Sequence, residues 1–178
     1  MVSPILLVSG PSGVGKTTVA PLVAATFDLG VHVRAESFWA FVVSGWVDPS
    51  KPESAHQNHV LGGVVAAAAI QFAVGGYSVV VDGTFFPDGA DGMAQMCARR
   101  EVPLHYAVLR ADLATCLTRV AQRQGHEPVD PSAFAALHAR FADLGEDEAS
   151  VIDALQAPDD IAVELRSALA AGRLLRAG

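Results

Sequence analysis

Short apolar runs alternate along this chain with longer segments rich in alanine and polar residues. Runs at residues 5–8, 77–82 and 104–109 are bounded by glycine, proline or polar residues and predict buried strands, and residues 31–33 predict a short alternating strand. A shorter run at 151–153 predicts a fifth strand. Continuous apolar runs are typical of parallel strands that are covered on both faces, so a parallel sheet is expected.

The segments between the predicted strands have helical character. Asp112 is a predicted N-cap, and Gly75 with Gly76 is a plausible helix stop. The expected helices cover residues 17–27, 36–43, 53–74, 88–100, 113–123, 131–144 and 159–170, with a loop rich in proline and glycine at 45–52. Alternating strands and helices predict an α/β fold: a three-layer α/β/α sandwich around a five-stranded parallel sheet.

One motif gives this fold a candidate chemistry. Residues 10–17 fit the phosphate-binding pattern G-x-x-x-x-G-K-[ST], between a predicted strand and a predicted helix. Backbone N–H groups of such a loop surround a phosphate, the lysine reaches the β- and γ-phosphates, and the threonine hydroxyl binds Mg²⁺. The motif predicts binding of ATP and Mg²⁺ by a P-loop NTPase fold through Gly10, Pro11, Ser12, Gly13, Val14, Gly15, Lys16, Thr17 and Thr18.

A second landmark is the acid that ends the strand at 77–82. An apolar strand that ends in aspartate is the Walker B arrangement, in which the carboxylate lies beside the P-loop and holds Mg²⁺. Asp82 is therefore the predicted metal partner of Thr17. The pattern alone is common, and a surface acid is the competing interpretation.

Length, charge and hydropathy narrow the class of partner. The 178 residues are 51% hydrophobic, which suffices for one domain over 1–178 with a full core. The net charge of −7 does not indicate a basic surface for binding nucleic acid, so a small molecule is the expected partner. No unbroken apolar run approaches the ~20 residues of a membrane span, and no signal peptide is predicted. A cytoplasmic location is expected, and the oligomeric state is left open.

The region at 119–131 becomes polar and contains helix breakers. Arg119 and Arg123 lie four residues apart, so a helix places both guanidinium groups on one face. One interpretation is a mobile lid that brings positive charge to the transferring phosphoryl group and excludes water. The other is an ordinary solvated helix face.

These motifs together resemble the P-loop kinase family of small phosphotransferases. Its members include shikimate kinase, chloramphenicol phosphotransferase, the tunicamycin-resistance proteins and zeta-toxin-like kinases of the AAA family. The resemblance covers nearly the whole chain and implies transfer of the γ-phosphate of ATP to a hydroxyl group. It also implies that the loop after residue 153 passes the adenine and that Arg119 and Arg123 belong to the lid.

Glu36 is the predicted general base. Chloramphenicol phosphotransferase-like proteins carry an Asp-Ser pair where this chain has Glu36-Ser37, and that aspartate is taken to accept the proton of the substrate hydroxyl. An acid at the end of the second strand would also lie across the crevice from the P-loop, within reach of an acceptor. The alternative is that Glu36 only starts a helix, where the dipole favours a carboxylate.

The acceptor pocket is less well defined by the sequence. Phe38, Trp39, Phe41 and Trp46 either line an apolar pocket or belong to the core, and core is the simpler interpretation for each. Asn58, the sole asparagine, and Arg34 are further candidate substrate contacts. His56 and His59 lack a third ligand for a metal site. Cys97 and Cys116 are expected to be buried, unreactive thiols in two different helices.

Two functions follow from these residues. The first is a Mg²⁺-dependent kinase that phosphorylates a hydroxyl of a metabolite or antibiotic, with Glu36 as base. The second is a nucleotide-binding ATPase or switch that acts on a protein partner. A guanine-recognition motif of the type Asn-Lys-x-Asp and the Leu-Ser-Gly-Gly-Gln signature of transporter ATPases are both absent from the sequence. An acceptor cavity enclosed by Glu36 and the aromatic residues would favour the kinase, and an exposed surface there would favour the switch.

Overall fold

A parallel sheet organises the computed structural model, which describes residues 2–122 and 130–178. Its strand order is β2-β3-β1-β4-β5, and all neighbours along this path are parallel. The predicted five-stranded α/β fold is therefore confirmed. A sixth strand, absent from the sequence-based expectation, pairs antiparallel with β4. The strands are β1 (Ile5–Ser9), β2 (Gly30–Arg34), β3 (Ser78–Asp82), β4 (Leu104–Arg110), β5 (Val151–Asp153) and β6 (Leu175–Arg176).

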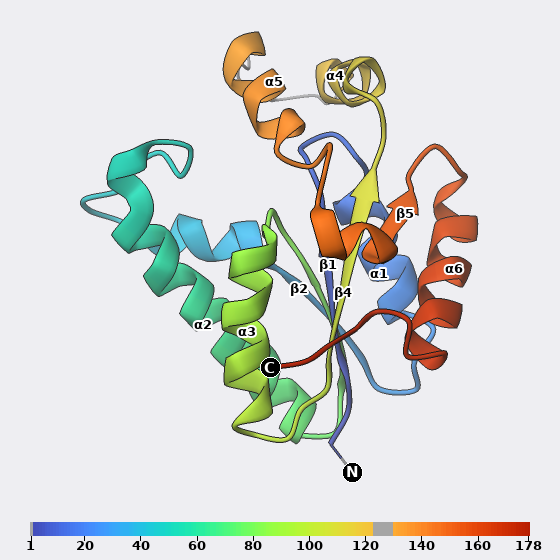
Figure 1. The fold of residues 1–178 in the computed structure, drawn as a ribbon. Coiled ribbons are helices and arrows are strands. Elements are labelled where there is room, and N and C mark those ends of the chain that lie inside the picture. The colour runs from blue at the N-terminus through green and yellow to red at the C-terminus, as the bar shows by residue number, and fades with distance from the viewer. Residues whose placement is uncertain (1, 123–129) are drawn as a thin grey trace.

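Helices cover both faces of this sheet, as Figure 1 shows. Helices α1 and α6 lie on one side, α2 and α3 on the other, and α4 and α5 stand beyond the carboxyl ends of the strands. The helices are α1 (Lys16–Ala24), α2 (Ala55–Val74), α3 (Pro87–Ala98), α4 (Leu113–Ala121), α5 (Pro131–Ala139) and α6 (Pro158–Ala170). Three short 3₁₀ segments are η1 (Ala35–Phe41), η2 (Pro52–Ser54) and η3 (Gly145–Ser150).

Several predicted helices differ from the observed ones at their ends. The helix expected at 17–27 ends at Ala24, and the one expected at 131–144 ends at Ala139. The segment expected as a short helix at 36–43 forms the 3₁₀ helix η1, which closes with a bond from Val42 N–H to the Trp39 carbonyl. Such i→i+3 bonding is typical of short helical pieces that join other elements.

The core consists of two layers, one on each face of the sheet. Successive residues of β1 point to opposite sides, so Ile5 and Leu7 pack under α2 and α3, whereas Leu6 and Val8 pack under α1 and α6. All four side chains are fully buried. Burial on both faces explains why β1 appears in the sequence as a continuous apolar run.

The two cysteines lie in different layers, as the sequence predicted for two separate helices. Cys97 belongs to α3 and Cys116 to α4, and both are buried and free. Burial raises the pKa of the Cys97 thiol to about 11, so little reactive thiolate forms near neutral pH. The prediction of buried thiols is confirmed.

One helical stretch of the described chain, Pro52–Val74, is long and apolar enough to cross a membrane by length and composition. The sequence analysis predicted no such segment. Val65, Ala69 and Ala73 of this stretch pack in the core against the sheet. A core helix of a globular protein meets the same criterion, so the finding is weak evidence for a membrane span.

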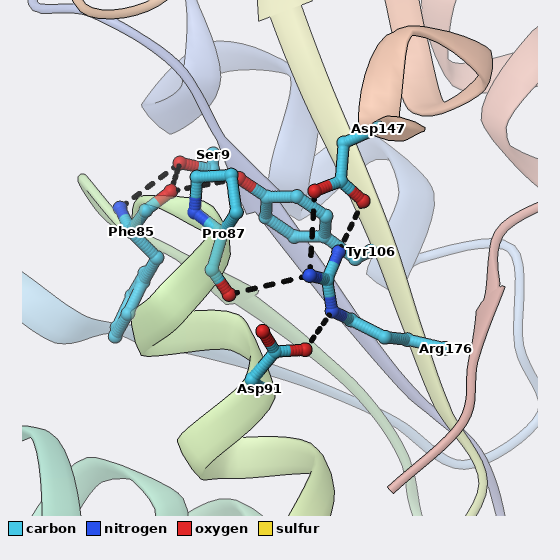
Figure 2. Close-up of polar contacts among 7 residues, drawn as sticks. All are labelled: Ser9, Phe85, Pro87, Asp91, Tyr106, Asp147 and Arg176. Carbon is cyan, nitrogen blue, oxygen red and sulfur yellow. Dashed lines mark hydrogen bonds and ion pairs between the residues drawn. The ribbon is translucent and has the colours of Figure 1, made fainter. Parts of the chain in front are cut away.

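A partly buried arginine in β6 fastens the C-terminal segment to the rest of the molecule (Figure 2). Arg176 Nε donates to Asp91 Oδ1 at 2.8 Å, its two Nη groups contact Asp147, and Nη2 donates to the Pro87 carbonyl at 3.3 Å. The guanidinium carbon lies 5.0 Å from the centre of the Tyr106 ring. Arg176 therefore joins β6 to α3, β4 and η3.

This network continues to the residue before the P-loop. The Tyr106 hydroxyl donates to the Phe85 carbonyl at 2.9 Å, and Phe85 N–H donates to Ser9 Oγ at 2.9 Å (Figure 2). Burial raises the pKa of Tyr106 to about 12, which keeps the hydroxyl protonated and able to donate. The segment that follows β3 is thereby fixed to the end of β1.

We expect Arg176→Gln to lower the free energy of unfolding by about 2 kcal/mol, because it leaves two carboxylates without their cation. Arg173→Gln is the matched control, since Arg173 pairs with Glu164 on the surface, where both side chains are about 40% exposed. That change should cost less than 1 kcal/mol. Urea unfolding measures the free energy of unfolding of both variants. Equal losses of stability would contradict the importance assigned to the Arg176 network.

Candidate functional site

The P-loop lies between β1 and α1, pressed against neighbouring backbone. Gly13 has φ +80°, and a Cβ there would stand 2.3 Å from the Cys116 carbonyl oxygen in α4. Gly10 has φ +137°, and a Cβ there would stand 2.4 Å from the Leu109 carbonyl oxygen in β4. Only glycine fits both the backbone conformation and the close approach. The loop therefore has a fixed position at the carboxyl ends of β1 and β4.

Lys16 is the first residue of α1, and only 5% of its surface is exposed. Its Nζ donates to the carbonyls of Gly10 at 2.8 Å and Pro11 at 3.0 Å, so the side chain folds back along the loop. The ammonium group is thereby held beside the loop N–H groups that would surround a phosphate. The contact of Lys16 with the β- and γ-phosphates stays a prediction.

Thr17 and Asp82 meet although 65 residues separate them. Thr17 Oγ1 donates to Asp82 Oδ2 at 2.9 Å, and Asp82 is 2% exposed at the carboxyl end of β3. The pairing of Val8 with Asp82 in the sheet register brings the acid beside the P-loop. A hydroxyl and a buried carboxylate are oxygen ligands suited to Mg²⁺. The residues present therefore fit the metal that the sequence predicted here.

His32 belongs to the same cluster, and the sequence analysis missed it. Its Nε2 lies 3.0 Å from Asp82 Oδ1, from the neighbouring strand β2. The sequence feature that could have pointed to His32 is its polar side chain between Val31 and Val33. It could be interpreted only once β2 was known to lie next to β3, because the sequence does not give strand order.

Glu36 follows β2 at the same edge of the sheet. Arg34, the last residue of β2, pairs in register with Asp82, and Glu36 follows two residues later in η1. Its side chain is 57% exposed, and Arg34 Nη2 lies 3.4 Å from Glu36 Oε2. The carboxylate is accessible from solvent, as the base of an incoming hydroxyl must be. Its role as base stays a prediction.

The aromatic residues near Glu36 divide into two pairs. Phe38 and Trp39 are partly buried against the core on the α2 side. Phe41 is 70% exposed and Trp46 is 53% exposed, so the core interpretation is wrong for these two. An apolar surface therefore extends beside Glu36, and its role in binding an acceptor stays a prediction.

Asn58 organises the loop before α2. Its Oδ1 accepts a hydrogen bond from Trp39 Nε1 at 3.1 Å, and its Nδ2 donates to Ser54 Oγ at 2.8 Å and the Pro49 carbonyl at 2.9 Å. Asn58 thus positions Trp39, which is itself a candidate substrate contact. A direct contact of Asn58 with substrate stays a prediction.

Arg119 lies on α4 beside the P-loop. Its Nη1 donates to the Val14 carbonyl at 3.0 Å and its Nη2 to the Ala154 carbonyl at 3.1 Å, so it joins the P-loop to the end of β5. The predicted lid at 119–131 begins here, but residues 123–129, Arg123 included, lie outside the described residues. The catalytic role of both arginines stays a prediction.

Two cavities open near the carboxyl ends of the strands, on opposite faces of the sheet. The smaller, about 270 Å³, is walled by the P-loop, α4, the end of β5 and the start of α6, with Thr18, Arg119 and Gln156 in its lining. The larger, about 600 Å³, lies beneath α5 and includes Arg110 and His138. Neither of these two cavities is lined by the candidate base or by the candidate substrate contacts, which are Glu36, Arg34, Phe38, Trp39 and Asn58.

The two histidines near the start of α2 are exposed. His56 and His59 lie in its first turns. Within 2–122 and 130–178, no group of three or more histidine, cysteine or acidic side chains is placed to hold a metal ion.

Strand order, P-loop and buried aspartate together define a P-loop α/β protein with the fold of small-molecule kinases. The family model described as an AAA domain matches residues 5–144, and the chain belongs to this family. No curated protein sequence is similar enough to this chain to count as a match.

Solved structures of two small-molecule kinases and of a tunicamycin resistance protein share the fold. A sugar kinase from Janibacter sp. HTCC2649 is 23% identical, with a TM-score of 0.71 over 94% of this chain and 95% of that one. The tunicamycin resistance protein of Deinococcus radiodurans is 20% identical, with a TM-score of 0.66 over 99% of both chains. The APS kinase CysC of Mycobacterium tuberculosis, in complex with AMPPNP and APS, is 14% identical, with a TM-score of 0.71 over 94% of this chain and 98% of that one.

We expect Gly13→Ala to weaken nucleotide binding and to lower the free energy of unfolding by about 2 kcal/mol, because its Cβ would meet the Cys116 carbonyl and its φ is strained for alanine. Binding of a fluorescent ATP analogue and urea unfolding measure the two effects. Gly62→Ala is the control, since Gly62 lies inside α2 with open space around its Cβ position. It should raise stability by about 0.5–1 kcal/mol. Unchanged nucleotide affinity in Gly13→Ala would contradict the assigned site.

Proposed function

We propose that this protein is a Mg²⁺-dependent kinase that transfers the γ-phosphate of ATP to a hydroxyl group of a small molecule, either a metabolite or an antibiotic. The observation that carries the proposal is the pairing of Thr17 with the buried Asp82 beside the P-loop. The kinase fold of the similar structures supports it.

The nucleotide would enter from the α1 and α6 side. The P-loop amides and the N-terminus of α1 attract its phosphates. The smaller cavity beside Arg119 and Gln156 is adjacent to that loop and offers room for the adenine ring of the nucleotide. The loop after Asp153 contributes Ala154 and Gln156 to this cavity. That placement agrees with the path of the adenine that the family resemblance implies.

Lys16 would stabilise the negative charge that develops on the transferring group. Thr17 and Asp82 would hold Mg²⁺, which would supply further positive charge to the phosphates. Arg119 and Arg123 are proposed to add positive charge from the lid. The guanidinium of Arg119 donates to two backbone carbonyls here, so a contact with phosphate would replace these neutral acceptors by an anionic one.

Glu36 would accept the proton of the acceptor hydroxyl as phosphorus–oxygen bond formation proceeds. Its accessible carboxylate lies at the end of the strand next to β3, so an acceptor held over these strand ends would have Glu36 on one side and the P-loop on the other. The exposed Phe41 and Trp46 would contact its apolar part, and Arg34 a polar or anionic part. Phe38, Trp39 and Asn58 are proposed to shape this surface.

The second candidate function is a nucleotide-dependent switch that binds a protein partner. The observation in its favour is the exposure of Glu36, Phe41 and Trp46, because an open apolar surface also suits a protein interface. Neither of the two cavities described above includes these residues. The two functions differ in whether a phosphorylated small molecule appears.

We expect a mass-spectrometric screen of hydroxylated metabolites and antibiotics, with ATP and Mg²⁺, to yield a phosphorylated product. Lys16→Ala should lower that turnover by at least about 10²-fold through loss of charge stabilisation. Lys51→Ala is the matched control, because Lys51 is the chain's other lysine and is exposed. ATP that is hydrolysed or bound with no phosphorylated product would support the switch instead. Full activity of Lys16→Ala would exclude the proposed site.

We expect Glu36→Gln to lower phosphoryl transfer by about 10²–10⁴-fold, because the amide cannot accept the hydroxyl proton. Affinity for ATP should stay within about twofold of the unmodified protein, since the proposed nucleotide contacts lie elsewhere. Single-turnover transfer and nucleotide binding are measured side by side, with Glu101→Gln as an exposed control before β4. An equal loss of ATP affinity would instead indicate a structural role for Glu36.

A further inference from the structure

The carboxylate of Asp82 is held from two sides by residues of different elements. Thr17 Oγ1, from α1, lies 2.9 Å from Oδ2, and His32 Nε2, from β2, lies 3.0 Å from Oδ1. An ionised carboxylate only accepts hydrogen bonds, so the proton between His32 and Asp82 belongs to the histidine nitrogen. Each carboxylate oxygen therefore has one donor and retains lone pairs for other partners.

The position of His32 within the sheet makes this contact specific. Its register partner is Val80, two residues before Asp82 in β3, so the imidazole reaches along the neighbouring strand to the carboxylate. The side chain is 23% exposed, and the Asp82 side chain is 3% exposed. Val31 and Val33, which flank His32, are apolar, and an apolar residue at 32 would leave Oδ1 without this donor. The histidine thus supplies a hydrogen bond that packing alone does not require.

Two anchors restrict rotation of the carboxylate about χ2, a torsion that has broad preferences when unrestrained. A carboxylate oriented in advance pays less conformational entropy when it receives a cation or a cation-bound water. Partners that hold metal ligands in this way commonly change metal affinity 10–100-fold when they are removed.

We propose that His32 is a positioning residue for the Mg²⁺ site: its hydrogen bond fixes the Asp82 carboxylate in the orientation that receives Mg²⁺ together with Thr17. This inference rests on the proposed function, because it assumes that nucleotide binds with Mg²⁺ at the P-loop. His32 touches neither metal nor substrate in this scheme and acts through Asp82 alone. Removing the imidazole should therefore affect the Mg²⁺-dependent part of nucleotide binding and spare the rest.

The test is a Mg²⁺ titration of fluorescent ATP analogue binding at fixed pH, with a parallel titration in EDTA. In His32→Leu the Mg²⁺ concentration at half-saturation should rise about 10–100-fold, while affinity for the analogue in EDTA stays unchanged. His32→Gln, whose amide retains an N–H donor, should recover part of the difference. Mn²⁺ binding followed by electron paramagnetic resonance should show the same order of variants without any turnover.

His105→Leu is the matched control. His105 is a buried histidine of β4, one residue from the amino end of its strand, whereas the P-loop lies at the carboxyl ends. Its replacement should leave the Mg²⁺ midpoint unchanged. Circular dichroism and thermal unfolding show whether each variant folds. If His32→Leu fails to fold, His32→Gln is compared with the unmodified protein instead.

The outcomes separate the inference from the proposed function. If the unmodified protein binds the analogue equally well with Mg²⁺ and with EDTA, the proposed Mg²⁺-dependent site fails. If the unmodified protein depends on Mg²⁺ and folded His32→Leu has the same Mg²⁺ midpoint, only the inference about His32 is overturned. Equal loss of affinity in EDTA and in Mg²⁺ would also overturn it, because the effect would not act through the metal ligand.

Discussion

The parallel pairing of β1 with both β3 and β4 is the constraint on which the site depends. In this register Val8 lies opposite Asp82 on one side and Ala107 on the other. Because all three strands run in the same direction, their carboxyl ends lie at one edge of the sheet. The P-loop follows β1 at this edge, and Asp82 is the last residue of β3. The 2.9 Å contact between Thr17 and Asp82 is a consequence of this register.

Close backbone contacts hold the nucleotide side of that edge. The Leu109 and Cys116 carbonyls stand against Gly10 and Gly13, and Arg119 joins the P-loop to the end of β5. The acceptor side differs, because η1 and the loop after it expose Phe41 and Trp46 and are held mainly by side chains of α2. Asn58 is one of these, and Gln57 is another, with bonds of 2.9 and 2.7 Å to the N–H and carbonyl of Val47. The side proposed to bind nucleotide is thus closely packed, and the side proposed to bind the acceptor exposes apolar side chains.

Local sequence patterns predicted the parts of this fold that depend on local physics. The central strands β1, β3 and β4 appear as apolar runs because they are buried nearly throughout, and the P-loop is recognisable because each glycine and Lys16 has a separate chemical reason. The sixth strand was missed because Leu175 and Arg176 form only a two-residue pair that exists through contact with β4. His32 was missed for a related reason, since its partner on β3 is adjacent in space and 50 residues away in sequence.

Strand β2 and the segment just after it contribute a residue to the proposed metal site and a residue to the proposed acceptor site. His32 contacts the metal-site carboxylate from within the strand, and Glu36 follows the strand beside the open acceptor surface. The register of β2 on β3 fixes the offset between them, because Arg34, midway between the two, pairs with Asp82 itself. A shift of this strand by one residue would turn His32 away from Asp82, since neighbouring side chains of a strand point to opposite faces. The pairing of β2 with β3 therefore places His32 against Asp82 and starts η1, with the proposed base Glu36, at the same edge of the sheet.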